Sequence, residues 1–186
     1  MPKSRNKERE RVFCLVKKAV LSMTSTLVVG YFLIPYKPPK LPTAFDRLIY
    51  TLRWQTLSVL TLVAGILKVA ITRFQTTAID PIAGNGEHHV IIDTHYIQNT
   101  VEQLFLNVIG QFILCTFLTS TQIKLIPIFV LLFVVGRITF WIGYKKSYLD
   151  RAFGFCLTML PNMILYTMNL AFMLFQGPSS GFGPIF

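Results

Sequence analysis

The sequence predicts an all-α integral membrane protein, and three observations lead to that fold class. Hydrophobic residues make up 53% of the 186 residues and charged residues only 14%, against about 25% charged in an average soluble domain. The hydrophobic residues gather in five runs, each long enough for a membrane helix. Polar side chains inside these runs recur at helical spacing. We therefore predict one polytopic domain with five transmembrane helices.

The first predicted helix covers residues 12–34 and is preceded by a basic N-terminus. A cleaved signal peptide also has a basic region before an apolar one, but here Pro35 and a proline-rich link follow in place of a small-residue cleavage site. We favour a retained helix whose lysines reach the membrane interface. Residues 1–47 thus comprise the basic N-terminus, an extra transmembrane helix and a proline-rich link.

Four further helices are predicted at residues 48–74, 96–119, 123–144 and 152–175, the last kinked at Pro161. Together they form a four-helix bundle over residues 48–175, followed by a flexible tail at 176–186. A polar loop at residues 76–95 holds all three histidines (His88, His89 and His95). No cysteine lies near them, so a solvated loop is favoured over a zinc site.

Cationic residues predict the orientation of the chain in the membrane. The N-terminus with the loops at 75–95 and 145–151 carries at least ten lysines and arginines, whereas the opposite side carries five. The positive-inside rule then places the N-terminus in the cytosol. Nucleic acid is an alternative partner for the basic tail, but no recognition module accompanies it, so contact with anionic lipid is favoured.

A stripe of polar side chains lies at membrane depth in the third predicted helix. Residues 99–111 read NTVEQLFLNVIGQ, and the polar positions are three or four apart, which puts them on one helix face. A carboxylate at the bilayer centre costs roughly 2.5–3.5 kcal/mol on insertion scales, so such residues face a protein interior or a water-filled cavity. Glu102 and Asn99, in the first turn of the stripe, are therefore candidate ligand-binding residues.

Arg137 is a second polar anomaly, midway along the apolar run of the fourth helix. A guanidinium at that depth needs a partner. Glu102 is the only carboxylate in any predicted membrane segment. We therefore predict that Arg137 pairs with Glu102, either directly or through a charged ligand that bridges them.

Two more residues are predicted to lie beside this pair. Tyr144 follows Arg137 by seven residues and so shares its helix face, and Arg151 begins the fifth helix at the depth of Tyr144. A carboxamide, a carboxylate, two guanidinium groups and a phenol would thus converge near the cytosolic face. Such a pocket suits a small zwitterionic ligand presented beside lipid.

These residues resemble a motif of the MAPEG family, the membrane-associated proteins in eicosanoid and glutathione metabolism. Members show R-x3-N-x2-E at the start of a membrane helix, where this chain has His95-x3-Asn99-x2-Glu102. Members then show R-x2-Y-x3-Y and a further arginine, where this chain has Arg137, Phe140, Tyr144 and Arg151. The resemblance covers about residues 48–175. The extra N-terminal helix resembles the mattrin-like branch, which is thought to sit in secretory membranes.

The resemblance implies a homotrimer of four-helix subunits that binds glutathione between subunits near the cytosol. It implies that Arg151 is catalytic and stabilises the glutathione thiolate, while the other motif residues (His95, Asn99, Glu102, Arg137 and Tyr144) bind the ligand. Lys68 or Arg73 would add a basic group. Along the axis of the bundle or trimer, Asn107 and Gln111 would form interhelical hydrogen bonds.

Two departures from the motif leave two functions open. His95 replaces an arginine and Phe140 replaces a tyrosine, and a lost charge-assisted hydrogen bond costs about 1.5–3 kcal/mol. One expectation is a glutathione transferase or peroxidase that acts on a lipophilic electrophile. The alternative is a non-catalytic membrane protein that binds lipid or partner proteins. For either, we expect a membrane of the endoplasmic reticulum or another secretory compartment.

Overall fold

A computed structural model describes residues 2–33, 35, 37, 39–82 and 84–178. Every regular element in these residues is helical. The long helices are α1 (Pro2–Val28), α2 (Ala44–Gln75), α3 (Ile91–Phe117), α4 (Leu125–Lys146) and α5 (Arg151–Gln176). A π-helical turn, η1 (Val29–Leu33), extends α1, and single 3-10 turns form η2 (Thr77–Ile79), η3 (Glu87–His89) and η4 (Gln122–Lys124). Five helices in the described residues are long and apolar enough to cross a membrane, which confirms the all-α membrane class.

Two helix boundaries differ from the sequence prediction. The first helix begins at Pro2 rather than residue 12, because its basic and acidic N-terminal residues are themselves good helix formers. The third begins at Ile91, so His95 lies inside α3 and not in a loop. Asp93 explains the second difference: its buried carboxylate accepts a hydrogen bond from the Trp141 indole at 2.6 Å and lies 3.4 Å from the Lys145 ammonium. These contacts from α4 hold a polar segment in the helix.

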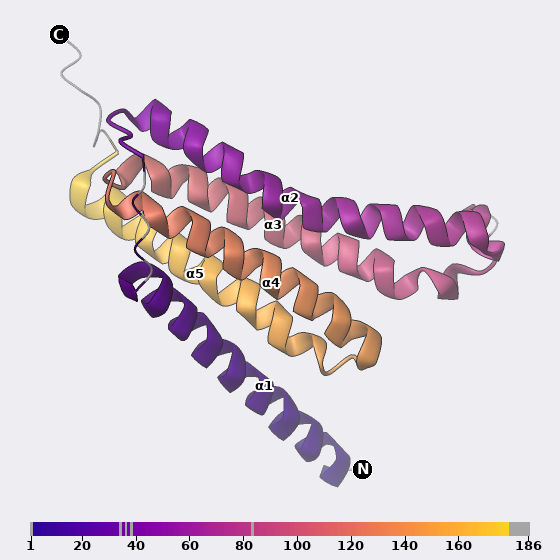
Figure 1. Ribbon diagram of the computed structural model, residues 1–186. Coiled ribbons are helices and arrows are strands. Elements are labelled where there is room, and N and C mark those ends of the chain that lie inside the picture. Colours follow the sequence, from indigo (N-terminus) through magenta and orange to yellow (C-terminus); the bar gives the residue numbers. More distant parts are fainter. Residues whose placement is uncertain (1, 34, 36, 38, 83, 179–186) are drawn as a thin grey trace.

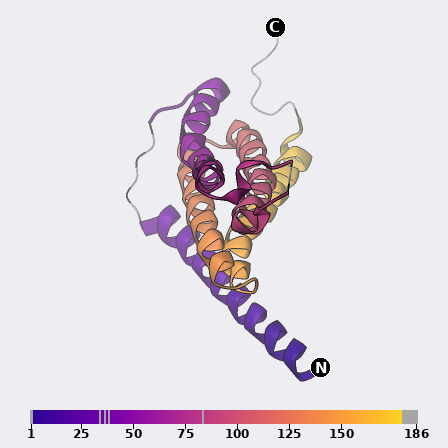
Figure 2. The same cartoon turned by 90° about the vertical axis from the view of Figure 1, so that its right-hand side faces the viewer.

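The helices form two antiparallel hairpins, α2–α3 and α4–α5, with α1 crossing the outside of the second (Figure 1). The N-terminus of α1, the α2–α3 connection and the α4–α5 turn lie toward the same end of the bundle (Figures 1 and 2). A small apolar cluster, centred on Met23, Ile128 and Leu157, packs α1 onto α4 and α5. This arrangement puts the connections that we expect to be cytosolic on one side.

A buried carboxamide network joins the α2–α3 hairpin. Gln55 donates to Gln111 at 2.9 Å, Gln111 donates to Asn107 at 3.0 Å, and Asn107 donates back to Gln55 at 3.4 Å. Gln103 joins the α5 side, where it accepts a hydrogen bond from Asn162 at 3.2 Å. The deep part of the polar stripe is thus an interhelical seam within one chain, as predicted for a bundle.

Close contact between α4 and α5 depends on glycine. A Cβ on Gly154 would meet the backbone nitrogen of Phe140, and one on Gly136 would meet the Thr158 side chain. Because backbone cannot move aside without moving the whole helix, Gly154 fixes the distance between the two helices. This distance positions both Arg151, at the start of α5, and Phe140.

The variant Gly154→Ala should therefore destabilise the protein by about 1–3 kcal/mol, as overpacking generally does. Gly30→Ala is the matched control, because the added methyl would meet only the flexible Ile128 side chain, at 3.1 Å. We expect a clearly smaller loss for the control in unfolding titrations of the protein in detergent micelles. Equal losses for the two variants would contradict the assigned α4–α5 contact.

Candidate ligand-binding site

A cavity of about 530 Å³ lies where α3, α4 and α5 meet the α4–α5 turn and α1. Its volume falls within the range of small-molecule sites. Most of its walls come from α3 and α5, and its polar lining residues are His95, Gln98, Asn99, Glu102, Tyr148 and Arg151. Four of the six predicted site residues therefore line one cavity. The remaining two, Arg137 and Tyr144, lie beside it.

The α3 wall presents a carboxylate. Glu102 is exposed and, among the described residues, it makes no hydrogen bond or ion pair within the chain. Asn99, one turn earlier, uses its carbonyl oxygen to accept a hydrogen bond from Arg137 at 2.8 Å, which leaves its NH₂ group available. The α3 wall thus offers an anionic acceptor beside a neutral donor.

Arg137 does not pair directly with Glu102, so the direct pair expected from the sequence is wrong, while a bridging charged ligand stays a prediction. Its guanidinium is fully buried and donates to the oxygens of Asn99 and Thr158. It also lies 4.8 Å from the ring centroid of Phe140. Two neutral oxygens and an aromatic face therefore surround the charge without a carboxylate, while the buried Nε–H has no hydrogen-bond partner among the described residues. Arg137 lies behind the cavity wall and not on it, so its contribution is to hold Asn99.

Tyr144 does not line the cavity, but its ring contacts residues that do. The Arg151 guanidinium carbon lies 4.8 Å from the Tyr144 ring centroid, and the His95 and Tyr144 rings are 6.4 Å apart. The aromatic ring steers Arg151 by a cation–π contact. Arg151 is exposed and has no ion pair in the described part of the chain. Its charge is consequently available to a ligand in the cavity.

Helix α1 takes part in the site, which the sequence analysis did not predict. Val12 lines the cavity, and Arg11 forms two hydrogen bonds with the Asp150 carboxylate, at 3.1 and 2.8 Å. Glu8 accepts a hydrogen bond from Tyr148, and this contact raises the pKa of the Tyr148 hydroxyl above its ordinary value. Nothing in the local pattern of residues 2–28 indicates these contacts, because they depend on how α1 crosses α5.

The basic group expected from α2 does not reach the cavity. Arg73 forms an ion pair with Glu87 at 2.7 Å and donates to the Ala78 carbonyl at 2.9 Å. Lys68 is exposed and is absent from the cavity walls. Within a single chain, Arg151 is therefore the one arginine or lysine among the described lining residues.

The partners of Arg137 can be tested by comparing two substitutions. Thr158→Val removes an acceptor from a buried guanidinium and should cost about 1–3 kcal/mol of unfolding free energy. Glu102→Gln, by contrast, changes an exposed group and should stay within about 0.5 kcal/mol of the wild type. Denaturant titration in detergent micelles measures both values. If Glu102→Gln were the more destabilising variant, the result would support a direct Arg137–Glu102 pair and contradict the partners assigned here.

The chain is similar to proteins named Transmembrane protein 79. It is 28% identical to the mouse protein over 172 residues, which cover 92% of this chain and 44% of the mouse protein. It is 29% identical to the bovine protein over 172 residues, which cover 92% of this chain and 43% of that protein. The chain thus spans less than half the length of these curated relatives. No family model matches the chain, and no solved structure matches it. The names of its relatives and its own helices together identify the chain as a multi-pass membrane protein.

Proposed function

We propose that this protein binds glutathione in the cavity between α3 and α5 and transfers or oxidises its thiol in reactions with a lipophilic electrophile. One observation carries the proposal: His95, Asn99, Glu102 and Arg151 line a single cavity, and they are the residues that the MAPEG resemblance assigns to glutathione. The cavity lies at the bundle end that we expect to face the cytosol, where glutathione would enter.

The cavity chemistry matches the charges of glutathione, which has an ammonium group, two carboxylates and a thiol. The free Glu102 carboxylate supplies a partner for the ammonium. The His95 ring supplies a hydrogen-bond donor for a carboxylate. The Arg151 guanidinium, held over Tyr144, supplies the positive charge that favours a thiolate over a thiol. The ligand would thus be bound at its amino end by α3 and at its sulfur by α5.

Arg151 would then promote a nucleophilic reaction. A thiolate forms a C–S bond with an electrophilic carbon that the bilayer delivers, while the thiol proton leaves to solvent and the electron pair of the broken bond stays with the leaving group or the adjoining carbon. With a lipid hydroperoxide, the thiolate would instead attack the outer peroxide oxygen and break the O–O bond, which gives the lipid alcohol and a glutathione sulfenic acid. The thiol of a second glutathione would then displace water from the sulfenic acid and form the disulfide. The apolar wall at Phe140 and Phe155 suits either lipophilic substrate.

We also propose a homotrimer in a membrane of the secretory pathway, such as the endoplasmic reticulum, with a cytosolic N-terminus. An exposed carboxylate within a membrane helix is costly, and Glu102 has no partner among the residues that the structure describes. A neighbouring subunit or a bound ligand would compensate it. The basic N-terminus supports the orientation through the positive-inside rule.

A second candidate function is non-catalytic binding of lipid or a partner protein, and helix α1 favours it. Val12 forms part of the cavity wall, and Arg11 fastens α1 to Asp150 in the α4–α5 turn. An added helix beside Arg151 restricts the access of a second substrate. In addition, Phe140 stands where the MAPEG motif has a tyrosine, so this wall lacks a hydroxyl group that could bind glutathione.

The thiolate is the signal that separates the two candidates. We expect purified wild-type protein to bind glutathione, and the bound thiol to ionise with a pKa below the value of about 8.5 that is usual for a cysteine thiol. Arg151→Ala should remove the ultraviolet thiolate absorbance at neutral pH. Glu102→Gln should weaken binding about ten- to a hundredfold, the equivalent of one charge-assisted hydrogen bond, as measured by isothermal titration.

Lys146→Ala is the control, since it removes a nearby exposed cation that does not line the cavity. Its thiolate signal should equal that of the wild type. An absence of binding at millimolar glutathione would reject the proposal outright. Binding without a thiolate signal would reject the catalytic reading and favour the second candidate.

A further inference from the structure

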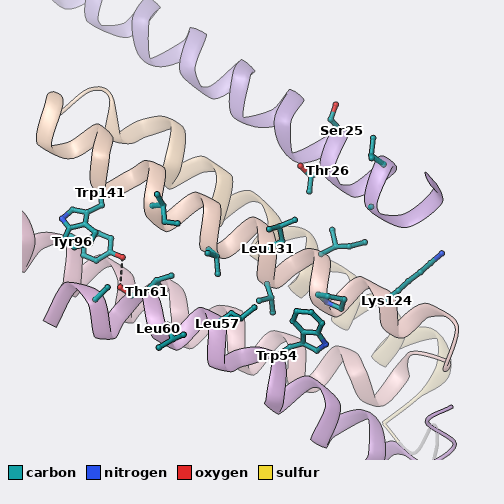
Figure 3. A pocket seen from close by; sticks show the side chains of 18 residues that line it. Ser25, Thr26, Trp54, Leu57, Leu60, Thr61, Tyr96, Lys124, Leu131 and Trp141 are labelled. Carbon is teal, nitrogen blue, oxygen red and sulfur yellow. Dashed lines mark hydrogen bonds between the residues drawn. The ribbon is translucent and has the colours of Figure 1, made fainter. Parts of the chain in front are cut away.

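A second and larger cavity, separate from the proposed glutathione site, runs between α1, α2 and α4. It has a volume of about 900 Å³ and shares no lining residue with the first cavity. Figure 3 shows Leu57 and Leu60 of α2 and Leu131 of α4 pointing into it, with Ser25 and Thr26 of α1 above them. We call this cavity the α1–α2–α4 groove. It lies at the depth of the membrane spans, so its natural occupant is a lipophilic molecule.

The hydroxyl groups of both threonines that line the groove already have acceptors. Thr26 donates to the Ser22 carbonyl at 2.8 Å, and Thr61 donates to the Ser58 carbonyl at 2.7 Å. Leucine, valine and isoleucine account for eight of the eighteen lining residues, and most of the others are also apolar or aromatic. A cavity of this kind offers little to water or to a polar ligand and favours a hydrocarbon chain.

Stacked aromatic rings close one end of the groove. Tyr96 and Trp141 lie with their ring centroids 4.6 Å apart and their planes 15° from parallel. The Tyr96 hydroxyl donates to the Thr61 carbonyl at 2.9 Å (Figure 3). Behind the rings, the Trp141 indole donates to Asp93, and Asp93 also pairs with Lys145 at 3.4 Å. The cation at this end therefore already has a carboxylate partner, so we expect a bound chain to end against the rings and its anionic head to lie at the opposite end.

The opposite end carries a cation, Lys124. Its ammonium donates to the Tyr31 carbonyl at 2.6 Å and lies 4.1 Å from the Tyr31 ring centroid. An ammonium group has three donor hydrogens, so two remain for another acceptor. Tyr31 belongs to the π-helical turn η1, and turns of this type often occur at functional sites. Lys124 thus holds α1 in place and still has hydrogen bonds to give.

A second cation, Arg53 of α2, lies toward the same end, although it does not itself line the groove. Arg53 precedes Leu57 and Leu60 by four and seven residues and so shares their face of α2. It is exposed, and no described residue forms a hydrogen bond or ion pair with it. The sole acidic residue in the sequence near this end, Asp46, is bonded to Thr43 in the capping box of α2. The rim of the groove therefore has an excess of positive charge that fits an anion.

We propose that the α1–α2–α4 groove binds one acyl chain of an anionic phospholipid, with the phosphate group held by Lys124 and Arg53. From Lys124 to Trp141, α4 rises about 25 Å at 1.5 Å per residue, more than half of a hydrocarbon core about 30 Å thick. A complete acyl chain of one leaflet therefore fits. Because α1 forms one wall, this lipid would join the extra helix to the four-helix bundle.

Photo-labelling in lipid nanodiscs tests the site. The full chain is reconstituted in phosphatidylcholine with a trace of phosphatidylglycerol that carries a diazirine on one acyl chain, and labelled peptides are mapped by mass spectrometry. The expected labels lie on the groove faces of α2 and α4. The same diazirine chain on phosphatidylcholine should label them about tenfold less, because the net negative charge of the headgroup is missing.

Two matched pairs of variants complete the design. Leu131→Trp fills the groove and should remove its labelling, whereas Leu170→Trp alters an equally exposed leucine (both 52%) outside the groove and should not. Lys124→Gln should abolish the preference for phosphatidylglycerol, whereas Lys40→Gln, another exposed cation near that end, should preserve it.

Three outcomes would overturn the proposal. Labels spread evenly over all exposed helix faces would indicate ordinary annular lipid. Equal labelling by the two probes would exclude a headgroup site at Lys124. A cysteine at position 131 that crosslinks to a second copy of the chain would show that protein fills the groove. None of these results depends on glutathione binding, so the two proposals can fail separately.

Discussion

The buried guanidinium of Arg137 is the constraint on which the rest of the bundle depends. A charge at that depth must be compensated, and both of its oxygen partners come from other helices: Asn99 from α3 and Thr158 from α5. The three helices are consequently fixed in rotation and in height relative to one another. Since Asn99 lies one turn from both His95 and Glu102, and Thr158 lies two turns from Arg151, this single group positions both walls of the proposed glutathione site.

Two other features fix the same relative positions of the helices. Gly154 lets the backbones of α4 and α5 touch, so the helix that carries Arg151 cannot slide along its neighbour. The ring of carboxamides formed by Gln55, Asn107 and Gln111 locks α2 to α3 at the opposite end. Interhelical hydrogen bonds in membranes are weak individually, at about 0.6 kcal/mol. Their main effect here is to select one register among several that apolar packing alone would permit.

The sequence predicted the helices well, but it predicted less well which side chains pair between them. Runs of apolar residues predicted the five helices, and the spacing of Asn107 and Gln111 predicted an interhelical seam, because both features depend on local periodicity. The partner of Arg137 could not be predicted in this way. A carboxylate was the strongest candidate by charge, yet the rotation of α3 turns Glu102 toward the cavity and Asn99 toward Arg137. Likewise, Asp93 looked like a loop residue because its partner, Trp141, lies 48 positions away.

Phe140 shows how the two cavities constrain each other. Its ring lines the proposed glutathione site, touches the Arg137 guanidinium at 4.8 Å and lies 6.3 Å from the ring of Tyr96, which lines the α1–α2–α4 groove. One layer of aromatic rings therefore separates a polar cavity from an apolar groove. A tyrosine at this position would bring a hydroxyl into a place that is 2% exposed, where an unpaired polar group is costly. Phenylalanine at this position therefore keeps the partition between the cavity and the groove apolar, and it offers no hydrogen-bond donor to the proposed glutathione site.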